Sequence, residues 1–110
     1  MAKISTMTTK GESGKTYSFG VYPMDQSFRE IGGIYIITER FKNKEGQYRH
    51  RFIYIGQTED FSTRFDNHHK SDCFAEHNAT CICTLVEGDE DNRFAIETDL
   101  IRQHAPPCND

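Results

Sequence analysis

The sequence predicts an α+β domain, with a small antiparallel sheet of about three to four strands flanked by helices. Two observations lead to this prediction. Short runs that are dense in β-branched and aromatic residues, at 32–38, 51–56 and 80–86, are typical of strands. Two other segments, at about 60–70 and 90–104, instead carry apolar residues at helical spacing.

The length and composition favour a single folding unit. A chain of 110 residues with 35% hydrophobic and 12% aromatic residues can bury one modest core. Residues 1–16 show no periodicity, so we expect a flexible N-terminal arm followed by one domain over residues 17–110. Apolar residues alternate over 17–21 and then meet Pro23, which predicts a short edge strand.

The middle of the chain predicts a hairpin followed by a helix. Residues 32–38 and 51–56 read as its two strands, joined by a long polar loop that contains Asn43 and Gly46. The helix would begin after Asp60 or Thr58 as N-cap and continue to about Lys70, with Phe61 and Phe65 on one face.

The last strand and helix follow the same logic. After the strand at 80–86, the acidic segment GDED caps a helix over about 90–104, and Pro106 and Pro107 end it. Its apolar residues predict a buried stripe made of Phe94, Ile96, Leu100 and Ile101.

Charge is divided unevenly along the chain. The formal net charge is -4, but residues 1–71 hold 11 of the 13 Lys and Arg and 8 of the 17 Asp and Glu. The acidic excess therefore belongs to residues 72–110, and a nucleic acid would have to bind the first part.

The sequence also suggests a cellular location. No apolar run approaches the roughly 20 residues of a membrane helix, and no signal peptide is recognisable, so we expect a cytoplasmic protein without a membrane partner. In that setting the four cysteines are expected to be free thiols or metal ligands rather than disulfides: Cys73, Cys81, Cys83 and Cys108.

Several side chains could form a site for phosphodiester chemistry. Tyr35 and Tyr54 in adjacent hairpin strands fall on one face if the register allows, and phenols can order or deprotonate a water. Arg64 and His68 would form an i, i+4 pair on one helix face, where the guanidinium could hold a phosphate oxygen. Gly56 would permit a sharp turn and a close approach of backbone or substrate.

Glu97 is the most informative single residue of this set. It stands beside the apolar stripe of the last helix, where an unpaired carboxylate would be costly to bury. A divalent cation would remove that cost. The sequence therefore favours Glu97 as a metal ligand.

These residues resemble, in order, the motifs of the GIY-YIG endonuclease family over roughly residues 32–109. The motifs are Gly33-Ile34-Tyr35, Tyr54-Ile55-Gly56, Arg64, His68, Glu97 and Asn109. The resemblance implies that Glu97 is the sole protein ligand of one Mg²⁺ or Mn²⁺. It also implies that Tyr54, helped by Tyr35 or His68, takes the proton of the attacking water, and that Asn109 fixes a tyrosine or the phosphate.

Two features depart from the family pattern. The family often has a lysine directly after YIG, whereas this chain has Gln57. The segment between the two tyrosines is also longer than usual and strongly basic, so we expect it to contact DNA. Its cations are Arg40, Lys42, Lys44, Arg49 and Arg51.

The cysteines and histidines offer a competing interpretation, a structural zinc site. The spacing of Cys73, His77, Cys81 and Cys83 supplies four soft ligands. His69 and Cys108 are further ligands of the same kinds. However, Cys81 and Cys83 also share one face of the strand at 80–86, where cysteine behaves as a small apolar residue. We favour the second interpretation.

The leading functional interpretation is a metal-dependent endonuclease that hydrolyses DNA with little sequence specificity of its own, one strand per active site. A double-strand cut would need a homodimer or two successive nicks. The alternative is a catalytically weak or inactive GIY-YIG fold that binds nucleic acid or protein, and a third possibility is a small zinc-stabilised binding domain.

Overall fold

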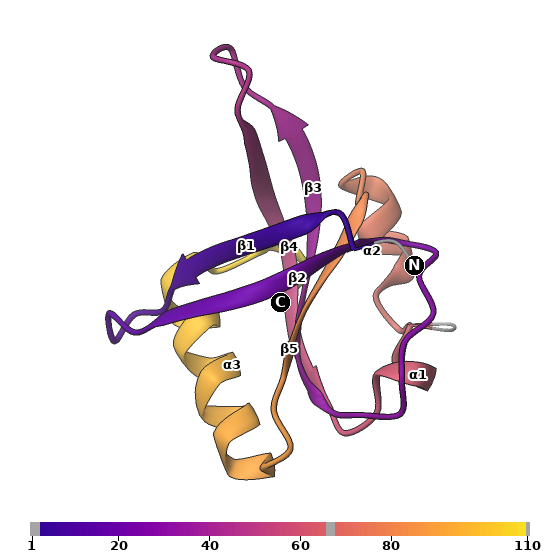
Figure 1. Cartoon of the computed structure of the whole chain (residues 1–110), viewed down its shortest axis with the longest axis vertical. Helices are drawn as coiled ribbons and strands as arrows, with labels where there is room; N and C mark the ends of the chain where they lie inside the picture. Colours follow the sequence, from indigo (N-terminus) through magenta and orange to yellow (C-terminus); the bar gives the residue numbers. More distant parts are fainter. Residues whose placement is uncertain (1–2, 66–67, 110) are drawn as a thin grey trace.

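The computed structural model describes residues 3–65 and 68–109, and this part of the chain has the expected α+β fold (Figure 1). Its strands form one antiparallel sheet in the order β1-β2-β5-β3-β4. They are β1 (Ser5–Lys10), β2 (Thr16–Pro23), β3 (Gly33–Lys42), β4 (Tyr48–Thr58) and β5 (Cys81–Val86). The helical elements are α1 (Phe61–Arg64), α2 (Ser71–Glu76), α3 (Glu90–His104) and the 3-10 turn η1 (Pro107–Asn109).

The sheet has one strand more than expected, because part of the presumed N-terminal arm is ordered. Ser5–Lys10 alternates between half-buried and exposed residues and pairs with β2 along its whole length. Strand β2 is consequently an inner strand between β1 and β5, not the predicted edge strand, and Pro23 occupies its last position. The threonines of β1 have the β propensity that the absence of apolar periodicity concealed.

The hairpin of β3 and β4 is longer than the sequence suggested. The segment expected to be a long loop continues both strands as far as the pair Lys42 and Tyr48, and only residues 43–47 form the turn. The guanidinium of Arg40 lies 3.8 Å from the centroid of the Tyr48 ring, which helps to hold the two strands together. In Figure 1 this hairpin projects beyond the rest of the sheet.

The helix expected between Asp60 and Lys70 is broken. Helix α1 begins with Asp60 as N-cap, as predicted, but ends at Arg64, and α2 begins only at Ser71. Residues 66 and 67 of the expected helix lie outside the described part. The segment DNHH after Phe65 consists of residues with low helix propensity, and helices this short depend on tertiary packing.

Helix α3 matches its predicted bounds. The side chain of Asp89 caps its N-terminus, Ala105 leaves it in the left-handed conformation, and two prolines follow. Leu100 is buried, with Ile96 and Ile101 packed beside it, but the prediction for Phe94 was wrong, because that ring is 47% exposed. None of the described helices is long and apolar enough to span a membrane.

The two faces of the sheet carry separate clusters of buried side chains. Ile34, Ile36 and Ile55 pack with Leu100 of α3 on one face. Tyr35, Ile37 and Tyr54 pack with Phe61 of α1 and Phe74 of α2 on the other. Figure 1 shows α3 on one side of the strands and the two short helices on the opposite side. The second face therefore holds the two tyrosines singled out in the sequence.

Candidate active site

The strand register places the two tyrosines next to each other. Tyr35 lies opposite Gly56 and Ile37 lies opposite Tyr54, so the two rings point to the same face from diagonal positions. Their centroids are 5.9 Å apart. A register shift after Ile37 leaves Ile53 of β4 without a partner, and this bulge puts Ile53 on the same face as Tyr54.

Glycine is required at two positions for packing reasons. A Cβ on Gly56 would lie 2.6 Å from the Cζ and hydroxyl oxygen of Tyr35, so the ring rests directly on this glycine. A Cβ on Gly33 would lie 2.0 Å from the carbonyl oxygen of Leu85 on β5. Strand β4 continues to Thr58, so Gly56 permits the close approach that was expected but does not end its strand.

The hydroxyl oxygen of Tyr35 is the centre of a hydrogen-bond network. The Nε of Arg64 donates to it over 2.9 Å, and Nε2 of His68 lies 2.7 Å away. The expectation that Arg64 and His68 share one helix face was wrong, because α1 ends at Arg64. The two side chains nevertheless meet, since both bind the same oxygen.

The hydrogen bonds of His68 determine which ring nitrogen carries the proton. The backbone N–H of Lys70 donates to Nδ1 over 3.0 Å, so Nδ1 is an acceptor and the neutral ring carries its proton on Nε2. Nε2–H therefore donates to Tyr35. Burial, followed by the nearby charge of Arg64, lowers the pKa of His68 to about 4, so the ring is neutral at pH 7.

The proton of Tyr35 is then directed to Tyr54. Burial raises the pKa of Tyr35, which keeps its hydroxyl protonated, and this hydroxyl donates a hydrogen bond to Tyr54. The network runs from Arg64 and His68 through Tyr35 to Tyr54. Arg64 and His68 donate to Tyr35, and Tyr35 in turn donates to Tyr54, so Tyr54 is the last acceptor of the network and the member best placed to accept a proton from outside.

Glu97 reaches the same region from the helix on the other face of the sheet. Its carboxylate is half-buried and accepts a hydrogen bond from the backbone N–H of Gln57. Burial raises the pKa of Glu97, while Arg64 and the Gln57 N–H oppose that shift. The Glu97 carboxylate is half-buried and offers two oxygen ligands, which suit one hard divalent cation. The residues present therefore fit the Mg²⁺ or Mn²⁺ expected from the sequence.

The free edge of β4 explains why the last two elements converge here. The side-chain amide of Asn109 accepts from the backbone N–H of Ile55 and donates to its carbonyl, both over 2.8 Å. Asn109 and Glu97 thus bind the edge of β4 on either side of Gly56. Asn109 was expected to fix a tyrosine or the phosphate, and the structure shows it bound to the backbone directly after Tyr54.

A groove of about 440 Å³ opens beside this network. Arg64, His68 and His69 line it together with the acidic residues Glu59 and Asp60. The Asp60 carboxylate is occupied in capping α1 through the N–H and hydroxyl of Ser62. The groove thus joins solvent to the guanidinium and imidazole that contact Tyr35.

Comparison with known proteins agrees with this geometry. The family model described as the GIY-YIG catalytic domain matches residues 31–109. The chain belongs to the GIY-YIG family. The family is one of nucleases, so the network described above occupies a nuclease scaffold. Neither the curated proteins nor the solved structures contain a significant match to this chain.

At the position where GIY-YIG proteins often have a lysine, the structure reveals a cation that the sequence analysis missed. The Gln57 amide oxygen accepts a hydrogen bond from Nε of Arg93 over 3.0 Å. Arg93 is only 6% exposed, and its NH1 group also donates to the carbonyls of Glu87 and Gly88. Its place four residues before Glu97, on the same side of α3, was the signal that could have identified it.

The five cations of the hairpin divide between its two faces. By alternation from Tyr35, Glu39 and Phe41 lie on the face of the tyrosines, and they pair with Arg51 and Arg49. Arg51 forms an ion pair with Glu39 and lies over the Phe41 ring. Arg40 and Lys42 lie on the other face, against Tyr48, and Lys44 is in the turn. The basic segment is therefore not one continuous surface.

The cysteines do not form the site proposed from their spacing. Cys81 and Cys83 are free and buried within the sheet, as their alternation suggested. Cys73 and Cys108 are joined in a disulfide with Cα atoms 6.0 Å apart, so the expectation of free thiols was wrong for this pair. The prolines before Cys108 turn the chain back toward α2, a contact that sequence spacing could not show. His69 lies elsewhere and stacks on His68, with ring centroids 4.6 Å apart.

Proposed function

We propose that this protein is a metal-dependent endonuclease that hydrolyses phosphodiester bonds in DNA. The observation that carries the proposal is the convergence of Arg64 and His68 on the Tyr35 hydroxyl, with Tyr54 as the final acceptor. The charge of Arg64 also reaches Glu97, so cation, proton acceptor and carboxylate belong to one electrostatic unit.

In the proposed mechanism Tyr54 acts as general base for the attacking water. Tyr54 acts as its phenolate, after its own proton has passed to solvent, and becomes a neutral phenol when it takes the proton of the attacking water. The hydrogen bond from Tyr35 stabilises the negative charge of that phenolate, and Arg64 and His68 polarise Tyr35 in turn. His68 already donates through Nε2, so it acts by orienting Tyr35 and not by taking the proton itself. Tyr35, which is fully buried, is thus a positioning residue for the more accessible Tyr54.

Arg64 would hold the phosphate. Its Nε–H is used by Tyr35, and among residues 3–65 and 68–109 no acceptor binds its two terminal NH₂ groups. Those groups can pair with non-bridging oxygens and offset the charge of the transition state. Glu97 would hold the divalent ion, which when bound polarises the phosphate and stabilises the leaving oxygen.

We further propose that the hairpin binds the DNA backbone mainly through Arg49, Arg51 and Lys44. Arg49 and Arg51 lie on the face of Tyr35, whereas Arg40 and Lys42 lie on the opposite face. Contacts to phosphate alone carry no sequence information, which is consistent with low specificity. One site cuts one strand, so a double-strand break would require a homodimer or two nicks.

The face assignment can be tested by two matched double substitutions. Replacing Arg49 and Arg51 by Gln is expected to make the slope of log affinity against log salt concentration less steep, by the amount that about two phosphate contacts contribute. Replacing Arg40 and Lys42 by Gln is expected to leave it nearly unchanged. Filter binding or fluorescence anisotropy at several salt concentrations measures both, and equal losses would contradict the assignment.

Plasmid nicking in Mg²⁺ or Mn²⁺ tests the catalytic proposal. Glu97→Gln and Arg64→Ala are each expected to lower the nicking rate by about 10²–10³-fold, because each removes a charge that stabilises the transition state. Arg102→Ala is the control, since Arg102 is exposed on the same helix as Glu97. Activity that survives both site substitutions would overturn the assignment of the site.

The second candidate is a weakly active or inactive member of the family that binds nucleic acid or protein. The specific observation in its favour is Gln57, whose amide is held by Arg93 where relatives often offer a lysine to the phosphate. This alternative predicts DNA binding without nicking in any divalent metal. It also predicts that Gln57→Lys does not weaken binding.

A further inference from the structure

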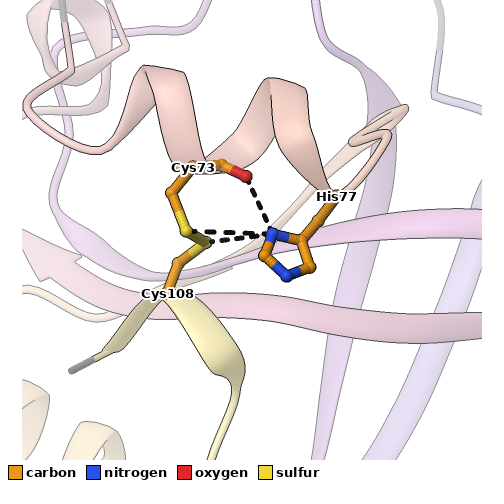
Figure 2. A group of neighbouring side chains, drawn as sticks. All are labelled: Cys73, His77 and Cys108. Carbon is orange, nitrogen blue, oxygen red and sulfur yellow. Dashed lines mark hydrogen bonds between the residues drawn. A yellow bond between two sulfur atoms is a disulfide. The ribbon is translucent and has the colours of Figure 1, made fainter.

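A second cluster of chemically reactive side chains lies away from the tyrosine network. Cys73 of α2 and His77, directly after that helix, face Cys108 of η1, as Figure 2 shows. Their possible ligand atoms lie within 4.8 Å of one another, and Nδ1 of His77 is 3.8 Å from each sulfur. In the structure the two sulfurs form a disulfide. No step of the proposed nuclease reaction uses these groups.

Two elements bring the three side chains together independently. Cys73 and His77 are four residues apart in and directly after α2, so they project from one side of the helix. Cys108 lies between Pro107 and Asn109 in η1, and the Asn109 amide ties that turn to Ile55 through two hydrogen bonds. The cluster is therefore organised by contacts that do not depend on the bond between the sulfurs.

We propose that Cys73, His77 and Cys108 bind one Zn²⁺ ion when the disulfide is reduced. Zinc prefers a tetrahedral set of thiolate and imidazole ligands, with bonds of about 2.3 Å to sulfur and about 2.0 Å to nitrogen. Neighbouring ligand atoms in such a set are about 3.5 Å apart, close to the distance between Nδ1 and each sulfur in this structure. Water completes the fourth position.

The chemistry balances with a dithiol as reductant. The dithiol gives two electrons and two protons to the disulfide, is itself oxidised to a disulfide, and leaves two thiols on the protein. In the structure Nδ1 of His77 lies 3.0 Å from the Cys73 carbonyl and donates its proton there. Zinc binding moves that proton to Nε2 and releases both thiol protons, a net release of two protons per ion.

The zinc site differs from the Glu97 site in ligand chemistry. Thiolate and imidazole are soft or borderline ligands that select zinc, whereas a lone carboxylate suits Mg²⁺ or Mn²⁺. Cys81 and Cys83 take no part, because they are buried in the sheet. Either the disulfide or the zinc ion links α2 to η1, so both keep Asn109 against the strand that carries Tyr54.

Cobalt titration of the full-length chain tests the proposal, because Co²⁺ bound by thiolate gives charge-transfer absorption in the near ultraviolet. The protein is reduced with dithiothreitol, freed of reductant without oxygen, and titrated with Co²⁺ and then Zn²⁺. One Co²⁺ per reduced chain should give these bands, and Zn²⁺ should displace it. The oxidised chain should give none, and Co²⁺ at Glu97 gives no thiolate band.

Two histidine variants separate the cluster from its surroundings. His77→Gln keeps the disulfide and is expected to weaken Zn²⁺ binding at least about tenfold, a loss comparable to that of other ligand-shell changes. His69→Gln is the matched control and should bind like the native chain, with circular dichroism confirming that both fold. The proposal is overturned if the reduced native chain gives no thiolate bands, if His77→Gln binds unchanged, or if reduction unfolds the protein.

Discussion

The two faces of the sheet are built from alternate residues of the same strands, yet they serve different purposes. On the face covered by α3, Ile34, Ile36 and Ile55 are fully buried and pack in an apolar cluster with Leu100. On the opposite face, Tyr35 and Tyr54 bury hydroxyl groups that require partners. Successive side chains of β3 point to opposite faces of the sheet. One therefore contributes to stability and the next to the proposed chemistry.

The comparison also shows how the site is joined across the sheet. Glu97 belongs to the helix that covers the apolar face, but its carboxylate reaches Gln57 at the edge of β4. Asn109 binds the same edge at Ile55. An edge strand is normally a liability, and here its unpaired groups position two residues of the candidate site.

The largest expected effects are those of substituting Tyr35 and Ile36, which are neighbours in β3 but lie on opposite faces of the sheet. Ile36→Ala should lower the free energy of unfolding by about 2–5 kcal/mol, because it empties a fully buried position, while folded molecules keep their nicking rate. Tyr35→Phe should cost about 1–3 kcal/mol, because Arg64 and His68 lose their acceptor, but should abolish most nicking. Urea unfolding measures the stability of both variants, and plasmid nicking measures their activity. Equal loss of activity per folded molecule would break the comparison.

Gly56→Ala tests the packing of the Tyr35 ring against Gly56. The added methyl group would overlap the ring and its hydroxyl, so we expect a loss of about 1–3 kcal/mol in unfolding free energy and a displaced Tyr35. Gly88→Ala is the matched control, because nothing lies within 4 Å of its Cβ, and it should change stability by less than about 0.5 kcal/mol. Thermal or urea unfolding measures both variants, and indistinguishable values would contradict the packing role.

Asn109→Ala sharpens the role of the β4 edge. It removes two hydrogen bonds to Ile55 and should cost about 1–2 kcal/mol in unfolding free energy. Asn92→Ala, at an exposed asparagine of α3, is the comparison and should cost less. Amide hydrogen exchange at Ile55 reports the edge directly. If exchange there were unaffected by Asn109→Ala, the edge would be held by other contacts.

The smallest expected effect is a pH dependence specific to the tyrosine face. The pKa of His68 is about 4 in the folded chain, below the ordinary histidine value of 6.5, so the unfolded chain binds the proton first as pH falls. Its contribution to stability is complete above pH 6.5 and is lost between pH 6.5 and about 4. Urea midpoints across this range should fall less steeply for His68→Gln than for the native chain or for His69→Gln. Parallel curves would show that His68 is not held neutral by the fold.

Elements with strong local signals could be predicted from the sequence. Runs dense in β-branched and aromatic residues predicted the cores of β3, β4 and β5, and caps and prolines predicted the bounds of α3. The order of the motifs, by its resemblance to the GIY-YIG family, also identified six candidate site residues: Tyr35, Tyr54, Arg64, His68, Glu97 and Asn109. These signals are local, so they can be read one segment at a time.

How these residues meet depends on contacts between segments that are distant in the sequence. Strand β1 exists because β2 offers it a partner, and Arg64 and His68 meet at an oxygen of β3 although no single helix carries both. The contacts of Asn109 with Ile55 and of Cys108 with Cys73 likewise join distant segments. Each depends on strand register, on a free sheet edge or on a chain reversal, and such long-range relations leave no periodic pattern in the sequence.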